Sequence, residues 1–140
     1  RILLGNTEKP LLLIDESYNA NTASMTAALD VFGTISVPGG KKVVVLGDML
    51  ELGEAGPSHH TGLAQSVIAA QPDAVYLVGA NMAHLADALP QQIFSRHFTG
   101  VDAATPELLA TLAYGDAVMV KGSNGVGLSR LVAAVKDTFQ

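Results

Sequence analysis

Short runs of apolar residues alternate with longer amphipathic segments along this chain. The apolar runs are Leu11–Ile14, Val43–Leu46, Ala74–Val78 and Ala117–Val120. None of them alternates apolar with polar positions, which is typical of strands that are covered on both faces. We therefore predict four buried strands here, and further strands near Ile2–Leu4 and His97–Thr99.

The segments between these runs show the spacing of amphipathic helices. The spacing i, i+3, i+4, i+7 occurs twice, in Met25, Ala28, Leu29 and Phe32 and again in Leu128, Leu131, Val132 and Val135. Another helix is expected to begin near Pro57–Ser58 and to continue through Leu63, Val67 and Ile68, and a shorter one contains Met82, Leu85 and Leu89. Alternation of strands and helices predicts an α/β fold with a mostly parallel sheet and helices on both faces.

Two loops are also predicted between these elements. Residues 36–40, with the sequence SVPGG, separate the first helix from the second buried strand. Thr105, Pro106 and Glu107 are typical of an N-cap, a first helical position and an acid in the first turn. This pattern predicts a helix that begins there and continues through Leu112, after a loop over residues 102–105.

Composition limits the possible classes of protein. A chain of 140 residues fits one domain, and 49% hydrophobic residues suffice for a substantial core. The net charge of -5 argues against nucleic-acid binding. The absence of cysteine is compatible with the cytoplasm, and no apolar run approaches the roughly 18 residues that span a membrane. Because the chain begins at Arg1 without methionine or a signal peptide, we expect it to be part of a longer protein.

Four polar loops follow the four buried strands: DESYNAN, GDMLELGE, GANM and KGSNGVG. In open α/β sheets, ligands bind outside the carboxyl ends of the strands. We therefore expect these loops to share a cleft, although polar loops of this kind also occur on any protein surface.

Several charged residues in these loops allow both a functional and a structural interpretation. Asp15 or Glu16 can accept hydrogen bonds from ribose hydroxyls, or can simply precede a helix capped by Asn19, Asn21 or Thr22. Asp48 and Glu51 can bind a cation or an ammonium group, or can be solvated. Lys121, beside Ser123, can hold a carboxylate or phosphate, or can extend to water. The residues alone leave these alternatives open.

Other patterns give no site. GSNGVG has the order G-x-x-G-x-G, and the chain lacks the G-x-x-x-x-G-K-[ST] phosphate loop. His59 and His60 are adjacent and so point apart on a helix, and His84 and His97 lie in other elements. We therefore predict no metal site and interpret the histidines as surface or capping residues. There is also no G-x-S-x-G elbow.

Three segments together resemble a known family. DESYNANTASM is similar to the D-D-S-Y-N-A-N-P-x-S-M signature of the Mur ligases that join D-alanyl-D-alanine to a UDP-N-acetylmuramoyl-tripeptide. GDMLELGE with His60 resembles the G-D-M-x-E-L-G segment and downstream histidine of these ligases, and VMVKGSNGVG resembles their K-G-S motif. The three matches occur in the family's order and cover the chain from Arg1 to its end.

The resemblance implies that residues 1–140 form the third, C-terminal domain of a three-domain ligase, with a Rossmann-like three-layer fold. In the family the first domain binds the UDP-sugar. The middle domain carries the phosphate loop and most ligands of Mg²⁺. The implied reaction is ATP-dependent: ATP phosphorylates the tripeptide carboxylate, and the amine of D-alanyl-D-alanine attacks the acyl phosphate. This chemistry belongs to peptidoglycan synthesis in the bacterial cytoplasm, and hence to cell-wall biogenesis, cell shape and cell division.

The resemblance also implies roles for individual residues. Arg1 occupies the position of an arginine that reaches the ATP phosphates when the domains close. Asp15 would contact the ATP ribose, with Tyr18 and Asn19 nearby. The dipeptide site would be formed by residues of the second and fourth loops, namely Asp48, Met49, Glu51, Leu52, Lys121 and Ser123. Without the other two domains, the isolated chain is expected to be inactive.

The sequence departs from the family at three points. Glu16 replaces the second aspartate, Thr22 replaces the usual proline, and Asn124 replaces the arginine that follows K-G-S. Apart from these departures, two alternatives stay open: a sibling Mur ligase that adds a single amino acid, and a non-catalytic nucleotide-binding or interaction module with the same fold.

Overall fold

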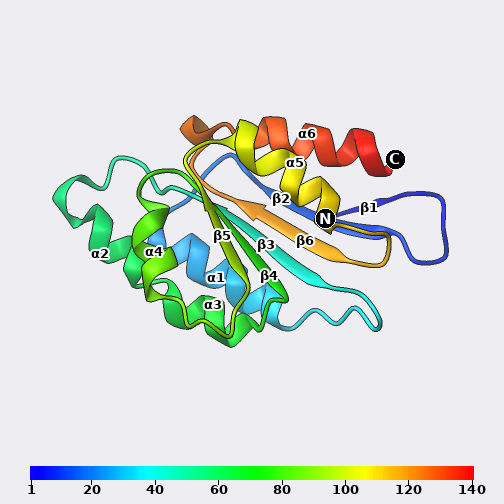
Figure 1. Cartoon of the computed structure of the whole chain (residues 1–140), viewed down its shortest axis with the longest axis horizontal. Helices are drawn as coiled ribbons and strands as arrows, with labels where there is room; N and C mark the ends of the chain where they lie inside the picture. Colours follow the sequence, from blue (N-terminus) through cyan, green and yellow to red (C-terminus); the bar gives the residue numbers. More distant parts are fainter.

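A six-stranded sheet in the order β1-β2-β6-β3-β4-β5 forms the centre of the chain (Figure 1). The computed structural model describes all residues from 1 to 140. The strands are β1 (Ile2–Leu4), β2 (Leu11–Glu16), β3 (Lys42–Gly47), β4 (Ala74–Val78), β5 (Ser95–Phe98) and β6 (Ala117–Lys121). β1 pairs antiparallel with β2 and all other neighbours are parallel, so the predicted mostly parallel sheet is confirmed.

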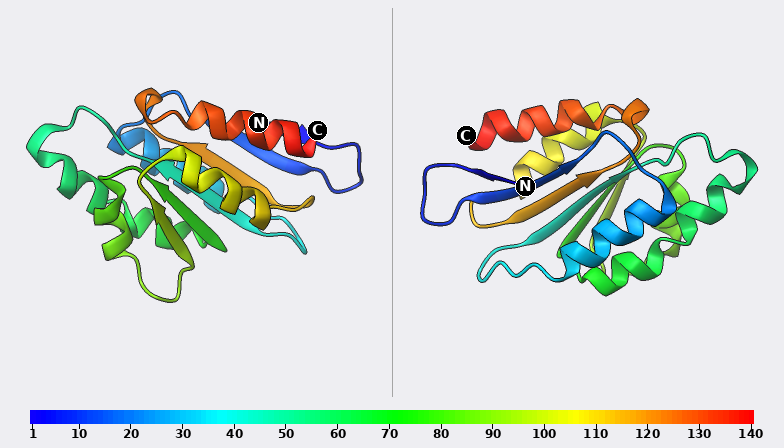
Figure 2. Two further views of the ribbon diagram at one scale, coloured as in Figure 1. Left: turned by 45° about the horizontal axis from the view of Figure 1, so that its top comes forward. Right: turned by 180° about the vertical axis from the view of Figure 1, so that it is seen from behind.

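Helices cover both faces of this sheet. They are α1 (Thr22–Gly33), α2 (Gly56–Thr61), α3 (Ala64–Ala70), α4 (Met82–Ala88), α5 (Val101–Thr111) and α6 (Leu128–Phe139), with short 3₁₀ turns η1 (Gly53–Ala55) and η2 (Asn124–Val126). α5 and α6 lie on one face, and α1, α3 and α4 lie on the other (Figure 2). None of the helices is long and apolar enough to cross a membrane.

The alternation of side chains along each strand divides the interior into two cores. Leu11, Leu13 and Val118 point towards α5 and α6, whereas Ile14 and Met119 point towards α1. The two clusters contain 20 and 19 buried residues, so the two faces are almost equally apolar. This explains why the strand sequences are continuous apolar runs: each successive residue enters one core or the other.

Two sequence predictions about helices are wrong. The helix predicted to begin at Thr105 begins at Val101 instead, after extended Gly100, and Pro106 lies inside it. Residues 102–105 are thus helical, and the Thr105 hydroxyl donates to the carbonyl oxygen of Val101 rather than capping a helix start. The single helix expected from Pro57 onward is divided into two: α2 ends at Thr61, with Gly62 as its C-cap, and α3 begins at Ala64.

Lys42 joins the ends of two helices at the amino edge of the sheet. Its ammonium nitrogen Nζ donates to the carbonyl oxygens of Gly33 at 3.3 Å and of Ala70 at 3.2 Å, which are the last residues of α1 and α3. The same ammonium lies 5.2 Å from the centroid of the Phe32 ring. A cation at these two carboxyl termini is favoured by both helix dipoles.

We therefore expect Lys42→Met to lower the free energy of unfolding by about 1 kcal/mol, because both helix termini lose their cation. Urea denaturation followed by circular dichroism measures the change. The matched control is Lys9→Met, since Lys9 is exposed and its side chain makes no hydrogen bond or ion pair. Equal stability of the two variants would contradict this role of Lys42.

Candidate functional site

The loops that leave the carboxyl ends of β2, β3, β4 and β6 meet at one edge of the sheet. They comprise residues 17–21, 48–52, 79–81 and 122–127. β6 lies between β2 and β3, so the loop with KGS lies between the loops with SYNAN and GDM. The convergence of these loops follows from parallel pairing, as the sequence predicted.

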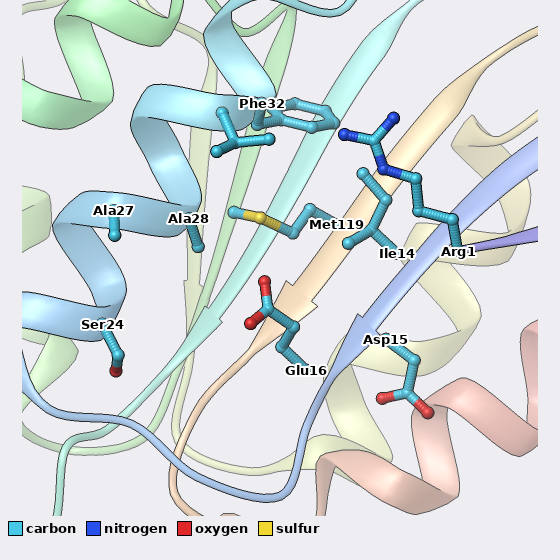
Figure 3. A pocket seen from close by; sticks show the side chains of 10 residues that line it. Arg1, Ile14, Asp15, Glu16, Ser24, Ala27, Ala28, Phe32 and Met119 are labelled. Carbon is cyan, nitrogen blue, oxygen red and sulfur yellow. The ribbon is translucent and has the colours of Figure 1, made fainter.

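Two hollows are relevant to the site: one lies between β2 and α1, and the other is formed by the loops at this edge. The first, which we call the β2–α1 groove, has a volume of about 450 Å³ (Figure 3). Its lining residues are Arg1, Ile14, Asp15, Glu16, Ser24, Ala27, Ala28, Val31, Phe32 and Met119. The second, which we call the loop pocket, has a volume of about 370 Å³ and is lined by Tyr18, Asn19, Ala20, Leu50, Glu51, Ser123, Asn124 and Gly125.

The expected ligand residues are divided between these hollows. Arg1 and Asp15 belong to the β2–α1 groove. Tyr18 and Asn19, which were expected near Asp15, instead line the loop pocket together with Glu51 and other residues of the second and fourth loops. The turn after β2 causes this separation, because it carries the chain away from the strand on which Asp15 lies.

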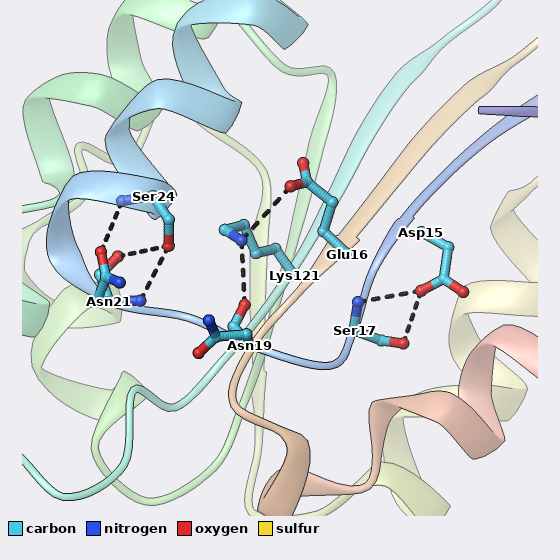
Figure 4. A network of polar contacts seen from close by, with 7 residues as sticks. All are labelled: Asp15, Glu16, Ser17, Asn19, Asn21, Ser24 and Lys121. Atoms are coloured by element: carbon cyan, nitrogen blue, oxygen red, sulfur yellow. Dashed lines mark hydrogen bonds and ion pairs between the residues drawn. The ribbon is translucent and has the colours of Figure 1, made fainter.

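Asp15 has one occupied and one free carboxylate oxygen. Oδ1 accepts hydrogen bonds from the backbone N–H of Ser17 at 3.0 Å and from the Ser17 hydroxyl at 2.6 Å (Figure 4). Oδ2 accepts no hydrogen bond within the chain. The turn therefore fixes the carboxylate in orientation and leaves an acceptor for a ligand donor. Figure 3 shows Arg1 extending towards Phe32, on the opposite side of β2 from the Asp15 carboxylate.

Lys121 is buried below the loop after β2. Its side chain is only 5% exposed, and its Nζ donates to the carbonyl oxygen of Asn19 at 3.0 Å and lies 3.6 Å from Oε1 of Glu16 (Figure 4). Glu16 and Lys121 are direct partners in the β2–β6 register, which places both side chains at the same level of the sheet. The ammonium thus holds the wall of the loop pocket, and it does not extend to water.

Ser123 joins the loop after β6 to the loop after β3. Its backbone N–H donates to the carbonyl oxygen of Asp48 at 3.1 Å, and its hydroxyl accepts from the backbone N–H of Leu50 at 3.0 Å. These two bonds fix the relative positions of the two loops that form much of the loop pocket.

Asp48 is buried and caps a helix. It is 5% exposed, and its two carboxylate oxygens accept from the backbone N–H groups of Asn81 at 3.1 Å and Met82 at 2.9 Å at the start of α4. Gly79 approaches so closely that an added Cβ atom would lie 2.4 Å from this carboxylate, and its φ of +117° is also a conformation that favours glycine. The carboxylate expected to bind a cation or an ammonium group is therefore occupied by backbone donors.

The remaining residues of this segment differ in exposure. Met49 is 1% exposed and belongs to the core beneath α1, so its side chain contributes to packing. Leu52 is half-buried and packs against the same core. Glu51 is exposed at the rim of the loop pocket with a φ of 65°, a left-handed conformation that is costly for a residue other than glycine. Backbone strain of this kind is often found at functional sites.

Two structural residues complete the edge. Asn21 caps α1: its side chain accepts from the N–H of Ser24, and the Ser24 hydroxyl accepts from the N–H of Asn21, which selects Asn21 among the predicted caps. His60, interpreted from the sequence as a surface or capping residue, is instead completely buried. The signal for this burial was its place in the resemblance, downstream of GDMLELGE. No group of three or more His, Asp or Glu side chains is arranged to hold a metal ion.

Comparison with known proteins finds a matching family. Residues 1–124 match the family model described as "Mur ligase, glutamate ligase domain". The UDP-N-acetylmuramoyl-tripeptide–D-alanyl-D-alanine ligase of Rickettsia prowazekii is 34% identical over 120 residues, which cover 86% of this chain and 26% of that protein. The chain thus spans about a quarter of the length of this curated relative.

Solved structures show the same fold. A crystal structure of MurF from Acinetobacter baumannii superposes with a TM-score of 0.79 at 24% identity, over 97% of this chain and 29% of that chain. MurF from Thermotoga maritima, solved in complex with ADP, superposes with a TM-score of 0.75 at 21% identity, over 96% and 30%. The predicted α/β fold class is confirmed.

The capping role of Asp48 leads to a stability prediction. Asp48→Asn replaces one acceptor oxygen by a donor, which leaves one N–H of α4 without its partner. We expect the free energy of unfolding to fall by about 1–2 kcal/mol. Urea denaturation tests this against Asp87→Asn, because Asp87 is an exposed residue of the same helix. A loss no larger than that of the control would show that the cap contributes little.

Proposed function

The chain belongs to the Mur ligase family, and from this membership we propose that it is the C-terminal domain of an ATP-dependent ligase that joins D-alanyl-D-alanine to a UDP-N-acetylmuramoyl-tripeptide. The identity to the Rickettsia prowazekii ligase supports this choice of substrates. The domain then acts as the third of three, and the first two domains supply the UDP-sugar site and the phosphate loop. Activity therefore requires the whole enzyme, in the cytoplasm, where ATP is available.

One observation carries the proposal: residues from the three matching loops meet at a single edge and line the loop pocket, and the β2–α1 groove, which contains Asp15, is a separate hollow. A ligase of this kind must hold a nucleotide and an amine substrate at the same time. Two hollows lined by different residues meet that requirement. A binding module for one nucleotide, the non-catalytic alternative, needs only one of them.

We assign the nucleotide to the free edge of β2. The ladder between β1 and β2 ends at the pair Ile2 and Leu13, so residues 14–16 have no strand on that side. Oδ2 of Asp15 is available to accept from a ribose hydroxyl, and Arg1 supplies a cation for phosphate on the other side of the strand. A nucleotide that lies against this edge contacts both residues when the domains close.

We assign the dipeptide to the loop pocket. Its volume of about 370 Å³ suits a small, polar molecule. Ser123, Asn19 and Asn124 provide polar groups for the peptide and carboxylate, and Glu51 provides an acceptor for the amine. The other expected dipeptide residues do not line this pocket and instead hold the loops that carry these contacts. They are Asp48, Met49, Leu52 and Lys121.

The chemistry assigned to the domain is positioning. The tripeptide carboxylate takes the γ-phosphoryl group of ATP and releases ADP, and the amine of the dipeptide then attacks the acyl phosphate and expels phosphate. Fixing the amine close to that carbonyl converts an encounter in solution into a reaction within one complex. Mg²⁺ would neutralise phosphate charge, and its ligands would lie mainly on the middle domain, since this chain offers no suitable group of carboxylates.

The nucleotide assignment predicts the effect of Asp15→Ala in the full-length enzyme. Loss of the ribose acceptor should raise the KM for ATP by about tenfold with little change in kcat, because the contact is made equally in ground and transition states. Steady-state kinetics at saturating dipeptide measure it. Asp137→Ala, which removes an exposed carboxylate on α6, is the control. An unchanged KM for ATP would rule out the ribose contact.

The dipeptide assignment predicts a different result for Lys121→Met. The variant keeps the length of the side chain but loses the 3.0 Å bond to Asn19, so the wall of the loop pocket is no longer held. We expect the KM for D-alanyl-D-alanine to rise by about tenfold and the KM for ATP by less than about threefold. Lys136→Met on α6 serves as the control. A larger effect on ATP would reassign Lys121 to the nucleotide side.

A further inference from the structure

His60 is a buried polar residue that touches neither hollow. It lies on α2 and is 0% exposed, although histidine usually keeps part of its ring in water. It is absent from the linings of the β2–α1 groove and the loop pocket. Any contribution to binding must therefore pass through the residues that it contacts.

Both ring nitrogens of His60 are engaged by backbone groups. Nε2 accepts from the N–H of Met49 at 3.0 Å, and Nδ1 lies 2.6 Å from the carbonyl oxygen of Gly56. An amide N–H can only donate and a carbonyl oxygen can only accept, so the partners determine the protonation of the ring. The imidazole must be neutral, with its proton on Nδ1.

Met49 is the middle one of three consecutive residues, 48–50, each of which is hydrogen-bonded to a different part of the chain. The carboxylate of Asp48 is bound by the start of α4, the N–H of Met49 by His60, and the N–H of Leu50 by the Ser123 hydroxyl. The next residue is Glu51, which has the left-handed backbone conformation and faces the loop pocket. Three consecutive anchors on three different elements thus determine where Leu50 and Glu51 lie.

We propose that His60 is a positioning residue for the loop pocket, acting through the lone pair of Nε2 on the backbone of Met49. This inference rests on the proposed function for its substrate, D-alanyl-D-alanine, but the bond itself does not. His60 never contacts the substrate. It holds the part of the pocket wall that contacts the substrate, and small displacements of this wall weaken the binding and alignment of the substrate.

Two substitutions of His60 distinguish the contacts that its two ring nitrogens make. Glutamine can place its Oε1 near the position of Nε2 and so keeps an acceptor for Met49. Asparagine can place its Nδ2 near the position of Nδ1 and keeps only the donor to Gly56. A purely structural histidine predicts similar effects of both, whereas a positioning histidine predicts that dipeptide binding follows the Met49 contact alone.

The test measures kinetics of the full-length enzyme carrying His60→Gln or His60→Asn, with His84→Asn as the control because His84 is exposed on α4. We expect both His60 variants to be less stable. His60→Asn should raise the KM for D-alanyl-D-alanine by about tenfold, His60→Gln by less than about threefold, and neither should change the KM for ATP. Equal increases in the two variants, or no increase in His60→Asn, would overturn the proposal.

A spectroscopic measurement keeps the proposal testable if a variant fails to fold. In the full-length enzyme labelled with ¹⁵N-histidine, the His60 ring should show a protonated Nδ1 and an unprotonated Nε2. A ring protonated on Nε2, or on both nitrogens, would overturn it. If the full-length enzyme does not join D-alanyl-D-alanine to a UDP-N-acetylmuramoyl-tripeptide in the presence of ATP, the proposed function fails, while this measurement still decides whether His60 holds Met49.

Discussion

The position of β6 between β2 and β3 determines the arrangement of the whole carboxyl edge. β6 is the last strand in the chain, yet it pairs with the first and second of the parallel strands. Its register sets Lys121 opposite Glu16 on one side and Leu46 on the other. The ammonium can therefore reach Asn19, and Ser123, two residues later, can reach Asp48 and Leu50. If β6 lay at the edge of the sheet, the loops of the three matching motifs would not meet.

The edge built in this way is held by buried polar groups that all have partners. Asp48, His60 and Lys121 are each at most 5% exposed, and no buried side-chain nitrogen or oxygen lacks a hydrogen bond. Most of their partners are backbone groups, and three of these, in Asn19, Met49 and Asn81, belong to the loops. Loops fixed by such contacts lose little further conformational entropy when a ligand binds. This suits a domain whose proposed task is to hold two molecules in fixed relation.

The sequence predicted the parts that depend on local patterns. The four buried strands, the order of strands and helices, and the meeting of the loops all followed from runs of apolar residues and one rule for parallel sheets. The predicted start of α5 was wrong because Thr105-Pro106-Glu107 is also compatible with the second turn of a helix that begins at Val101. The burial of His60 and the capping by Asp48 depend on contacts with Met49 and Met82 that only the tertiary fold creates.

Because buried side chains hold the loops that line the loop pocket, the shape of the pocket depends on the same contacts that stabilise the domain. A change at the rim, such as at Glu51 or Asn124, alters charge but leaves the supporting bonds in place. A change in Asp48, His60 or Lys121 alters the shape only by breaking a buried contact. An inhibitor that binds the backbone of residues 50 and 51 in the loop pocket would therefore be difficult to evade by mutation. Substitutions at the rim would not move that backbone, and those that moved it would weaken the fold on which the domain itself relies.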